Sequence, residues 1–277
     1  MSMTDAELAA ELAEAAGAIL LEVRRTSVFD ETALGKAGDQ TANQFLIHAL
    51  RHARPDDGLL SEESMDTPER LGKERVWIID PVDGTREYGE GRTDWAVHVA
   101  LAVGGVATIG AVALPGLDVV LRSDQPMTLP EGAAIPRMVV SRTRPASEAI
   151  AVAEALGAEL VAMGSAGAKA MAVVRGEAEI YLHTGGQYEW DSCAPVAVGL
   201  AHGLHATRID GAALVYNQPD THMPDLLICR PEWAGQVLDL VREMKAQSRS
   251  DDGQSQLFRG GRHQPHGRCR DRRDLRY

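Results

Sequence analysis

Apolar residues recur along this chain with the periods of helices and of short strands, and the two patterns alternate over most of its length. Behind a capping box at residues 4–7, the helical period predicts an amphipathic helix over residues 4–25. A polar loop is predicted next. It leads to a second helix over about residues 39–54, which stops before Pro55. Asp39 would then stand near the start of this second helix, where a helix cap is the plain interpretation of an aspartate.

Short apolar runs predict strands at residues 59–61, 76–79, 95–103, 106–114 and 118–122. Along 95–103 the large apolar side chains alternate, which is typical of a sheet with one face packed on helices. His98 falls on the opposite face of that strand. We interpret it as a structural histidine with satisfied hydrogen bonds rather than as a ligand.

Proline and glycine gather at residues 123–136 and predict a linker between two lobes, 1–125 and 137–245. The second lobe is predicted to hold strands at 138–141, 160–163, 178–183 and 226–229, and helices at 145–156, 168–175, 191–201 and 231–245. Gly185-Gly186 is predicted to be a flexible turn. This mixture of elements favours a layered α/β fold, with α+β character in the first lobe.

Composition and charge narrow the class of protein. A chain of 277 residues can bury a large core, and its net charge of −12 makes it a poor general binder of nucleic acid. The three cysteines (193, 229 and 269) form neither a zinc pattern nor a disulfide framework, which favours a reducing cytoplasm. The start of the sequence has no signal core, and glycines interrupt the apolar run 95–114, so no membrane span is predicted. Residues 246–277 are basic and poor in apolar side chains, which predicts a disordered tail.

The stretch from Trp77 to Thr85 carries the candidate chemistry. A buried strand ends at Asp80, and Asp83-Gly84 is turn chemistry three residues later. Two carboxylates at this spacing can face one hard cation, while the amides that start the next helix suit an anion. Without a His or Cys cluster at metal-ligand spacing, Zn²⁺ is disfavoured and Mg²⁺ is favoured. The sequence therefore predicts a site for metal and phosphate.

Three motifs in this order resemble those of a known family. Ser61-Glu62-Glu63, then Trp77-Ile-Ile-Asp-Pro-Val-Asp-Gly-Thr85, then Trp190-Asp-Ser-Cys-Ala-Pro195 are similar to the signatures of the inositol monophosphatase superfamily of Mg²⁺-dependent, lithium-sensitive phosphatases. The resemblance covers about residues 5–245. Residues 35–39 and 164–171 look closest to its CysQ branch, especially the actinobacterial members. It implies an αβαβα sandwich of two sheet-containing lobes, a cytoplasmic location and a homodimer.

The resemblance also implies a site that holds two or three Mg²⁺ ions and is inhibited by Li⁺. By this resemblance, Glu62, Asp80, the Val82 carbonyl and Thr85 would surround the first metal. The second metal would be held by Asp80, Asp83 and Asp191. Asp39, through Thr85 or a bound water, would orient and deprotonate the nucleophile, so Asp39, Glu62 and Thr85 are the candidate catalytic residues. A helix cap remains the alternative for Asp191.

Substrate contacts are implied in the same way. The amides of Gly84, Thr85 and Arg86 would cradle the phosphate, with Asp83 and Asp191 also touching the substrate. In the second lobe, Ser165, Gly167 and Lys169 would hold the other phosphate or the sugar of a nucleotide. Arg86 and Lys169 have a plainer interpretation as surface residues of helices. His183 stands where some nucleotide-specific relatives have Arg, and base stacking is left to Tyr188, Trp190 or Trp77.

The leading hypothesis is a 3′(2′),5′-bisphosphate nucleotidase that converts 3′-phosphoadenosine 5′-phosphate to AMP and phosphate in sulfate assimilation. An inositol-1-phosphate or fructose-1,6-bisphosphate phosphatase is the near alternative. The alternative of another class is a catalytically silent regulator that binds phosphorylated metabolites. The intact set of acids argues against silence. Neither nucleic acid nor a membrane is an expected partner.

Overall fold

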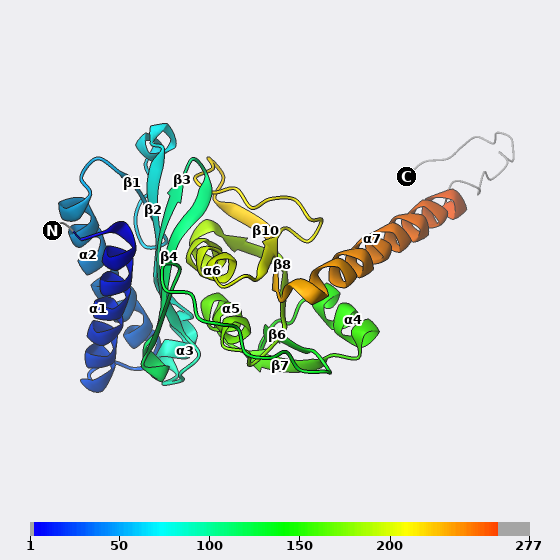
Figure 1. The fold of residues 1–277 in the computed structure, drawn as a ribbon, viewed down its shortest axis with the longest axis horizontal. Coiled ribbons are helices and arrows are strands. Elements are labelled where there is room, and N and C mark those ends of the chain that lie inside the picture. The colour runs from blue at the N-terminus through cyan, green and yellow to red at the C-terminus, as the bar shows by residue number, and fades with distance from the viewer. Residues whose placement is uncertain (1–2, 260–277) are drawn as a thin grey trace, which may run out of the picture.

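The computed structural model describes residues 3–259. In the first sheet the strand order is β1-β2-β3-β4-β5, and only the β1–β2 pair is parallel. Its strands are β1 (Gly58–Ser61), β2 (Arg75–Asp83), β3 (Ala96–Val103), β4 (Val106–Leu114) and β5 (Val119–Arg122). Helices α1 (Asp5–Arg25) and α2 (Glu31–Ala53) cover its outer face (Figure 1). The short helix α3 (Thr85–Gly89) follows β2, and single 3₁₀ turns occupy Pro68–Gly72 and Pro115–Leu117.

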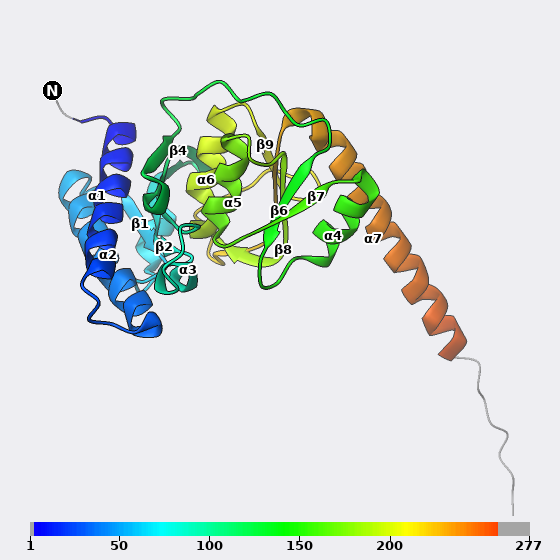
Figure 2. The same cartoon turned by 90° about the horizontal axis from the view of Figure 1, so that it is seen from below.

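A second sheet lies on the far side of two central helices, α5 (Ala166–Val174) and α6 (Glu189–Ala201). Its strand order is β7-β6-β8-β10-β9. The strands are β6 (Arg137–Ser141), β7 (Glu159–Met163), β8 (Ile180–Tyr188), β9 (His205–Thr207) and β10 (His222–Cys229). Helices α4 (Ser147–Leu156) and α7 (Pro231–Arg259) cover the other face (Figures 1 and 2). The layers are therefore αβαβα, and the predicted fold class is confirmed.

The alternation along β3 divides the core between two helix layers. Val97, Val99 and Leu101 join the buried cluster formed with α1 and α2. Ala96 and Ala100 face the opposite cluster, which contains the buried residues of α5 and α6. Small alanines on that face let α6 lie close to the sheet, and they bring the start of α6 against the end of β2.

The second helix begins earlier than the sequence predicted. Asp30 caps it, because its Oδ1 accepts from the Ala33 amide at 2.9 Å, and α2 then runs without a break from Glu31. The predicted polar loop before Asp39 is wrong, since Leu34 packs in the core and residues 31–38 form two helical turns. Asp39 lies in the middle of α2, so it is not a cap.

Three further expectations for the second lobe need correction. Gly185 and Gly186 have positive φ but lie inside β8, where the register with β10 shifts at a β-bulge instead of turning. Strand β9 was not predicted. The closing helix α7 continues to Arg259, where disorder was predicted from residue 246; residues 260–277 lie outside the described part. No helix among residues 3–259 is apolar over a length that would cross a bilayer.

Candidate active site

Strand β2 positions the two acids of the first signature. β1 and β2 are parallel, so their carboxyl ends meet at one edge of the sheet. Glu62 follows β1 there and its amide lies 3.4 Å from the Ile79 carbonyl. The backbone then departs from the ladder between Asp80 and Asp83, and Asp80 Oδ1 accepts from the Val82 amide at 3.1 Å. This irregular end aims both aspartates at the central helices.

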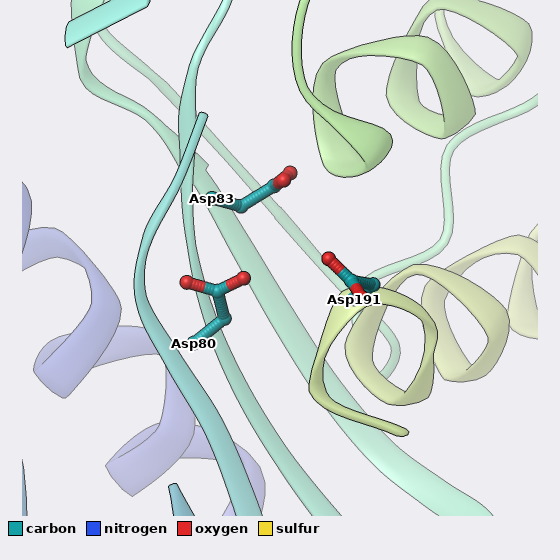
Figure 3. Close-up of side chains that lie close together, drawn as sticks. All are labelled: Asp80, Asp83 and Asp191. Carbon is teal, nitrogen blue, oxygen red and sulfur yellow. The ribbon is translucent and has the colours of Figure 1, made fainter. Parts of the chain in front are cut away.

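Asp191 reaches the same place from the first turn of α6. One carboxylate oxygen each of Asp80, Asp83 and Asp191 lies within 4.8 Å of the other two. Figure 3 shows the three side chains turned toward one another from β2 and α6. The structure thus brings together the three acids that the resemblance assigns to a second metal. Glu62 lies beside this cluster, and Asp39 lies near Glu62 and Thr85.

Burial and mutual repulsion raise the pKa values of these acids. Burial, followed by repulsion from Asp191, raises the pKa of Glu62 to about 7. Burial and then the nearby Asp83 raise the pKa of Asp191 to about 6. The pKa of Asp80 is also raised, by burial first and then by Glu62. An all-oxygen set that carries this much unbalanced negative charge fits a hard divalent cation such as Mg²⁺.

Asp83 is the exception in this group. Burial alone would raise the pKa of its carboxyl, but His98 and the Gly167 amide outweigh burial and lower it. Its Oδ1 accepts from the Ala166 amide at 3.1 Å, and its Oδ2 accepts from the Gly167 amide at 2.5 Å. Asp83 therefore links the end of β2 to the first turn of α5.

The start of α3 provides the predicted amides. Gly84 has φ of 89°, which favours glycine, and α3 begins at the next residue. The Thr85 hydroxyl lies 3.2 Å from the Val82 carbonyl and 3.5 Å from Asp39 Oδ1. Burial, followed by repulsion from Glu63, raises the pKa of Asp39 to about 8. The Thr85 hydroxyl therefore lies between the Val82 carbonyl and the Asp39 carboxyl.

A cavity of about 280 Å³ opens beside Asp83 and the start of α3. Arg86 and Ser165 line it, together with Arg144 from the loop between β6 and α4. Arg86 and Arg144 are exposed, and no ion pair involves either guanidinium within the described residues. A larger hollow of about 410 Å³ between α2 and α3 has none of the three aspartates in its lining, whereas Asp83 lines the smaller cavity, so we take the smaller cavity as the site.

Lys169 has other partners than the sequence suggested. Its side chain is buried, and its ammonium donates to the carbonyls of Gly164 and Ser165 at the start of its own helix. Burial lowers the pKa of Lys169. Lys169 is absent from the lining of the cavity, so its contact with a second phosphate stays a prediction. Ser165, by contrast, lines the cavity while its hydroxyl caps α5 through the Ala168 amide.

Sequence reasoning missed Arg144 and the contacts between the lobes beside it. Arg142 pairs with Glu87 of α3 at 2.8 Å and with Glu90, the residue that follows α3, at 2.6 Å. The available signal was the Ser141-Arg142-Thr143-Arg144 run at the carboxyl end of a buried strand, where ligands often bind in α/β sheets.

The aromatic candidates for base stacking also differ. Trp77 is buried and its indole donates to Asp57, so it is unable to stack on a base. Tyr188 and Trp190 stack on each other, with ring centroids 4.8 Å apart.

Comparisons with known proteins show the family of this chain. Residues 3–246 match the inositol monophosphatase family profile. A 3′-phosphoadenosine 5′-phosphate phosphatase of Mycobacterium leprae (strain TN) is 52% identical over 260 residues, covering 87% of this chain and 95% of that protein. The 3′(2′),5′-bisphosphate nucleotidase CysQ of Escherichia coli (strain K12) is 27% identical over 199 residues, covering 68% and 81%.

Solved structures share the fold. CysQ from Bacteroides thetaiotaomicron superposes with a TM-score of 0.74 at 23% identity, covering 82% of this chain and 97% of that one. An inositol monophosphatase from Anabaena gives a TM-score of 0.71 at 21% identity, covering 86% and 95%. Both confirm the layered architecture. On the profile match and the identity to the mycobacterial protein, this chain belongs to the inositol monophosphatase family.

Proposed function

We propose that this protein is a Mg²⁺-dependent phosphatase that removes the 3′-phosphate of 3′-phosphoadenosine 5′-phosphate and leaves AMP. The observation that carries the proposal is the 52% identity to a protein named for this activity, over 95% of that protein's length. The geometry supports it, because Asp83, one of the three aspartates that gather at the end of β2, lines a cavity that also presents the first amides of α3.

The acids would bind the metal, and the amides would bind the phosphate. Asp80, Asp83 and Asp191, with Glu62 beside them, would hold Mg²⁺. Bound Mg²⁺ neutralises phosphoryl oxygens and lowers the pKa of water. The Gly84 and Thr85 amides at the start of α3 would orient the phosphate through hydrogen bonds.

Thr85 and Asp39 handle the proton of the attacking water. The Thr85 hydroxyl lies between an acceptor carbonyl, that of Val82, and the Asp39 carboxylate. It can donate to only one of them at a time, so its lone pairs remain available to a water in the cavity. Asp39 then receives the proton of this water, either directly at its carboxylate or by relay through the Thr85 hydroxyl.

The phosphate that is not cleaved requires a separate cation, since the acids recruit metal only at the scissile one. Arg86 and Arg144 line the cavity, and neither has a carboxylate partner in the described part of the chain. We assign them to the remote phosphate because a guanidinium can bind phosphate through two parallel hydrogen bonds. Lys169 would act indirectly, by fixing the carbonyls at the start of α5.

The test is a substrate panel with purified protein: 3′-phosphoadenosine 5′-phosphate, inositol 1-phosphate and fructose 1,6-bisphosphate, each with Mg²⁺, with Mg²⁺ plus Li⁺, and with excess chelator. We expect the highest kcat/KM on the nucleotide, inhibition by Li⁺ and no turnover in chelator. A preference for either sugar phosphate would assign the near alternative. Binding without turnover on all three would assign the silent regulator.

The cytoplasmic location, the role in sulfate assimilation and the homodimer belong to this proposal as well. Light scattering of the purified protein tests the dimer directly, since a mass near 29.8 kDa would contradict it.

A further inference from the structure

His98 has an unusual position for a histidine that only fills the core. It lies on β3, on the strand face that is turned toward α5 and α6, and no part of it is exposed. Its two ring nitrogens meet two different segments of the site. Nδ1 lies 2.9 Å from the Trp190 carbonyl, and Nε2 lies 3.2 Å from Asp83 Oδ2.

These two partners lie on the two segments that carry the acids Asp83 and Asp191. Asp83 comes from the end of β2, and Trp190 is the residue directly before Asp191 at the start of α6. One imidazole ring therefore spans the gap between the segments that carry two acids of the cluster. Because the ring is rigid, its width sets the separation of those segments, which a flexible side chain would leave free.

The ring is itself held in place by the first turn of α5. A Cβ at Gly167 would overlap His98 Nε2 and lie 3.0 Å from Asp83 Oδ2, so only glycine lets that turn approach. The Ala166 and Gly167 amides hold the Asp83 carboxylate from the side of α5. Asp83 is thus oriented by α5 and spaced from Asp191 by His98.

We propose that His98 is a positioning residue that sets the distance between Asp83 and Asp191, and thereby the affinity for the metal that these two acids share. The inference rests on the metal-dependent site proposed above. Groups that orient metal ligands typically change metal affinity by about 10–100-fold when they are removed. Because His98 contacts Asp83 and the Trp190 carbonyl and does not line the cavity, the loss should appear in metal binding first.

Two substitutions separate the two contacts of the ring. The amide nitrogen of Asn falls near Nδ1, so His98→Asn keeps the Trp190 carbonyl and loses Asp83. The amide nitrogen of Gln falls near Nε2, so His98→Gln keeps Asp83 and loses Trp190. His202→Asn is the matched control, because His202 is also buried and its Nδ1 lies 2.8 Å from a carbonyl of α6, that of Val198, at the far end of the helix.

The experiment titrates metal-free protein with Mn²⁺ and counts free Mn²⁺ by electron paramagnetic resonance. We expect both His98 variants to bind one Mn²⁺ about tenfold more weakly or worse, with His202→Asn unchanged. Steady-state kinetics should agree: half-saturating Mg²⁺ should rise by a similar factor, while kcat at saturating Mg²⁺ recovers most of its value. Thermal melts in chelator identify any variant that does not fold, in which case the other variant decides.

Unchanged or tighter Mn²⁺ binding by a folded His98 variant overturns the positioning role. A drop in melting temperature with wild-type metal affinity also overturns it, since that result describes a core residue. Wild-type protein that binds no Mn²⁺ and shows no metal-dependent turnover overturns the proposed function itself. Failure of the inference and failure of the function therefore give different results.

Discussion

At the scale of single residues, the site separates acids that need a cation from one acid that already has partners. Glu62, Asp80 and Asp191 have raised pKa values because they are buried together. The pKa of Asp83 is lowered, although burial opposes this, because His98 and the Gly167 amide face it. Substitutions at these positions should therefore have different effects on folding and on catalysis.

Asp83→Asn should fold and yet lose turnover. The single amide oxygen of Asn can still accept from one of the two α5 amides that Asp83 binds, but the loss of an anionic oxygen weakens binding of the shared metal and the stabilisation of the transition state. We expect kcat to fall at least about a hundredfold at saturating Mg²⁺. Asp118→Asn is the control, because Asp118 is an exposed aspartate with φ of 55°, which Asn also tolerates. A variant that retained a tenth of wild-type kcat would remove Asp83 from the metal site.

Arg144→Gln and Lys169→Met should change kcat/KM differently on substrates with and without the remote phosphate. The two substrates to compare are 3′-phosphoadenosine 5′-phosphate and adenosine 3′-phosphate, which lacks the remote phosphate. Since Arg144 lines the cavity, its loss should reduce kcat/KM about tenfold on the bisphosphate only, mostly through KM. Since the Lys169 ammonium donates hydrogen bonds to backbone carbonyls, its loss should reduce kcat/KM by the same factor on both substrates. The opposite pattern would return the remote phosphate to Lys169, as the sequence first suggested.

At the scale of elements, the second sheet is joined to the first through a crossover, the segment of residues 123–136 that precedes β6. Glu179 comes directly before β8 and has no exposed surface. Its carboxylate accepts from the Ala133 amide at 3.1 Å, from the Arg137 amide at 2.7 Å and from the Arg137 guanidinium at 2.8 Å. One acid therefore holds the end of the crossover and the first residue of β6 against the start of β8.

Glu179→Gln should destabilise the protein by about 1–3 kcal/mol at pH 7, measured by urea unfolding. Burial opposes ionisation of Glu179, but the Arg137 hydrogen bonds outweigh it and lower its pKa below 4.5. A lowered pKa in the folded state means that the stabilisation exists above the unfolded pKa and is lost as pH falls through the folded one. The difference between wild type and variant should therefore shrink below about pH 4.

The control for this measurement is Glu177→Gln, because Glu177 is an exposed acid paired with Arg175. Its stability should stay within about 0.5 kcal/mol of wild type. A Glu179 effect that does not change with pH would show that shape, and not charge, holds the crossover.

At the scale of the whole molecule, the metal site connects the two sheets through the central helices. Asp80 and Asp83 belong to the first sheet, and Asp191 belongs to a helix that packs between both sheets (Figures 1 and 3). A cation shared by these acids binds only the folded arrangement. The net charge of −12 adds to the repulsion that the cation relieves.

Mg²⁺ should therefore stabilise the metal-free protein. At a hundred times its dissociation constant, a ligand of the folded state contributes about 2.7 kcal/mol, which corresponds to a rise of about 5–10 °C in melting temperature for a chain of this size. Differential scanning fluorimetry measures the rise, with Na⁺ at equal ionic strength as the control. An equal rise with Na⁺ would mean that screening, and not binding, stabilises the fold. Asp83→Asn should show a smaller rise.

Several features of this protein follow from the sequence alone. The alternation along β3 separates its two faces correctly, because the period of side chains in a strand is local and needs no knowledge of the partner. The Asp80–Thr85 motif and Trp190-Asp191 likewise predicted which acids gather, and the αβαβα architecture followed from their resemblance to a known family. In each of these cases, neighbours in sequence or a whole motif carry the information.

Other features were decided only by the tertiary structure. His98 meets a carbonyl 92 residues away, Lys169 turns its charge inward, and Arg144 rather than Lys169 lines the cavity. The position of Asp39 inside α2 depended on a cap at Asp30 that the periodicity did not reveal. The Asp30 cap and the Lys169 hydrogen bonds join residues only three to five positions apart, and they form because Leu34 and the first turn of α5 are buried in the core. For His98 and Arg144 the physical reason is a long-range one. The partner of a polar side chain is set by which segments the fold brings within hydrogen-bond distance, and that depends on packing between distant parts of the chain.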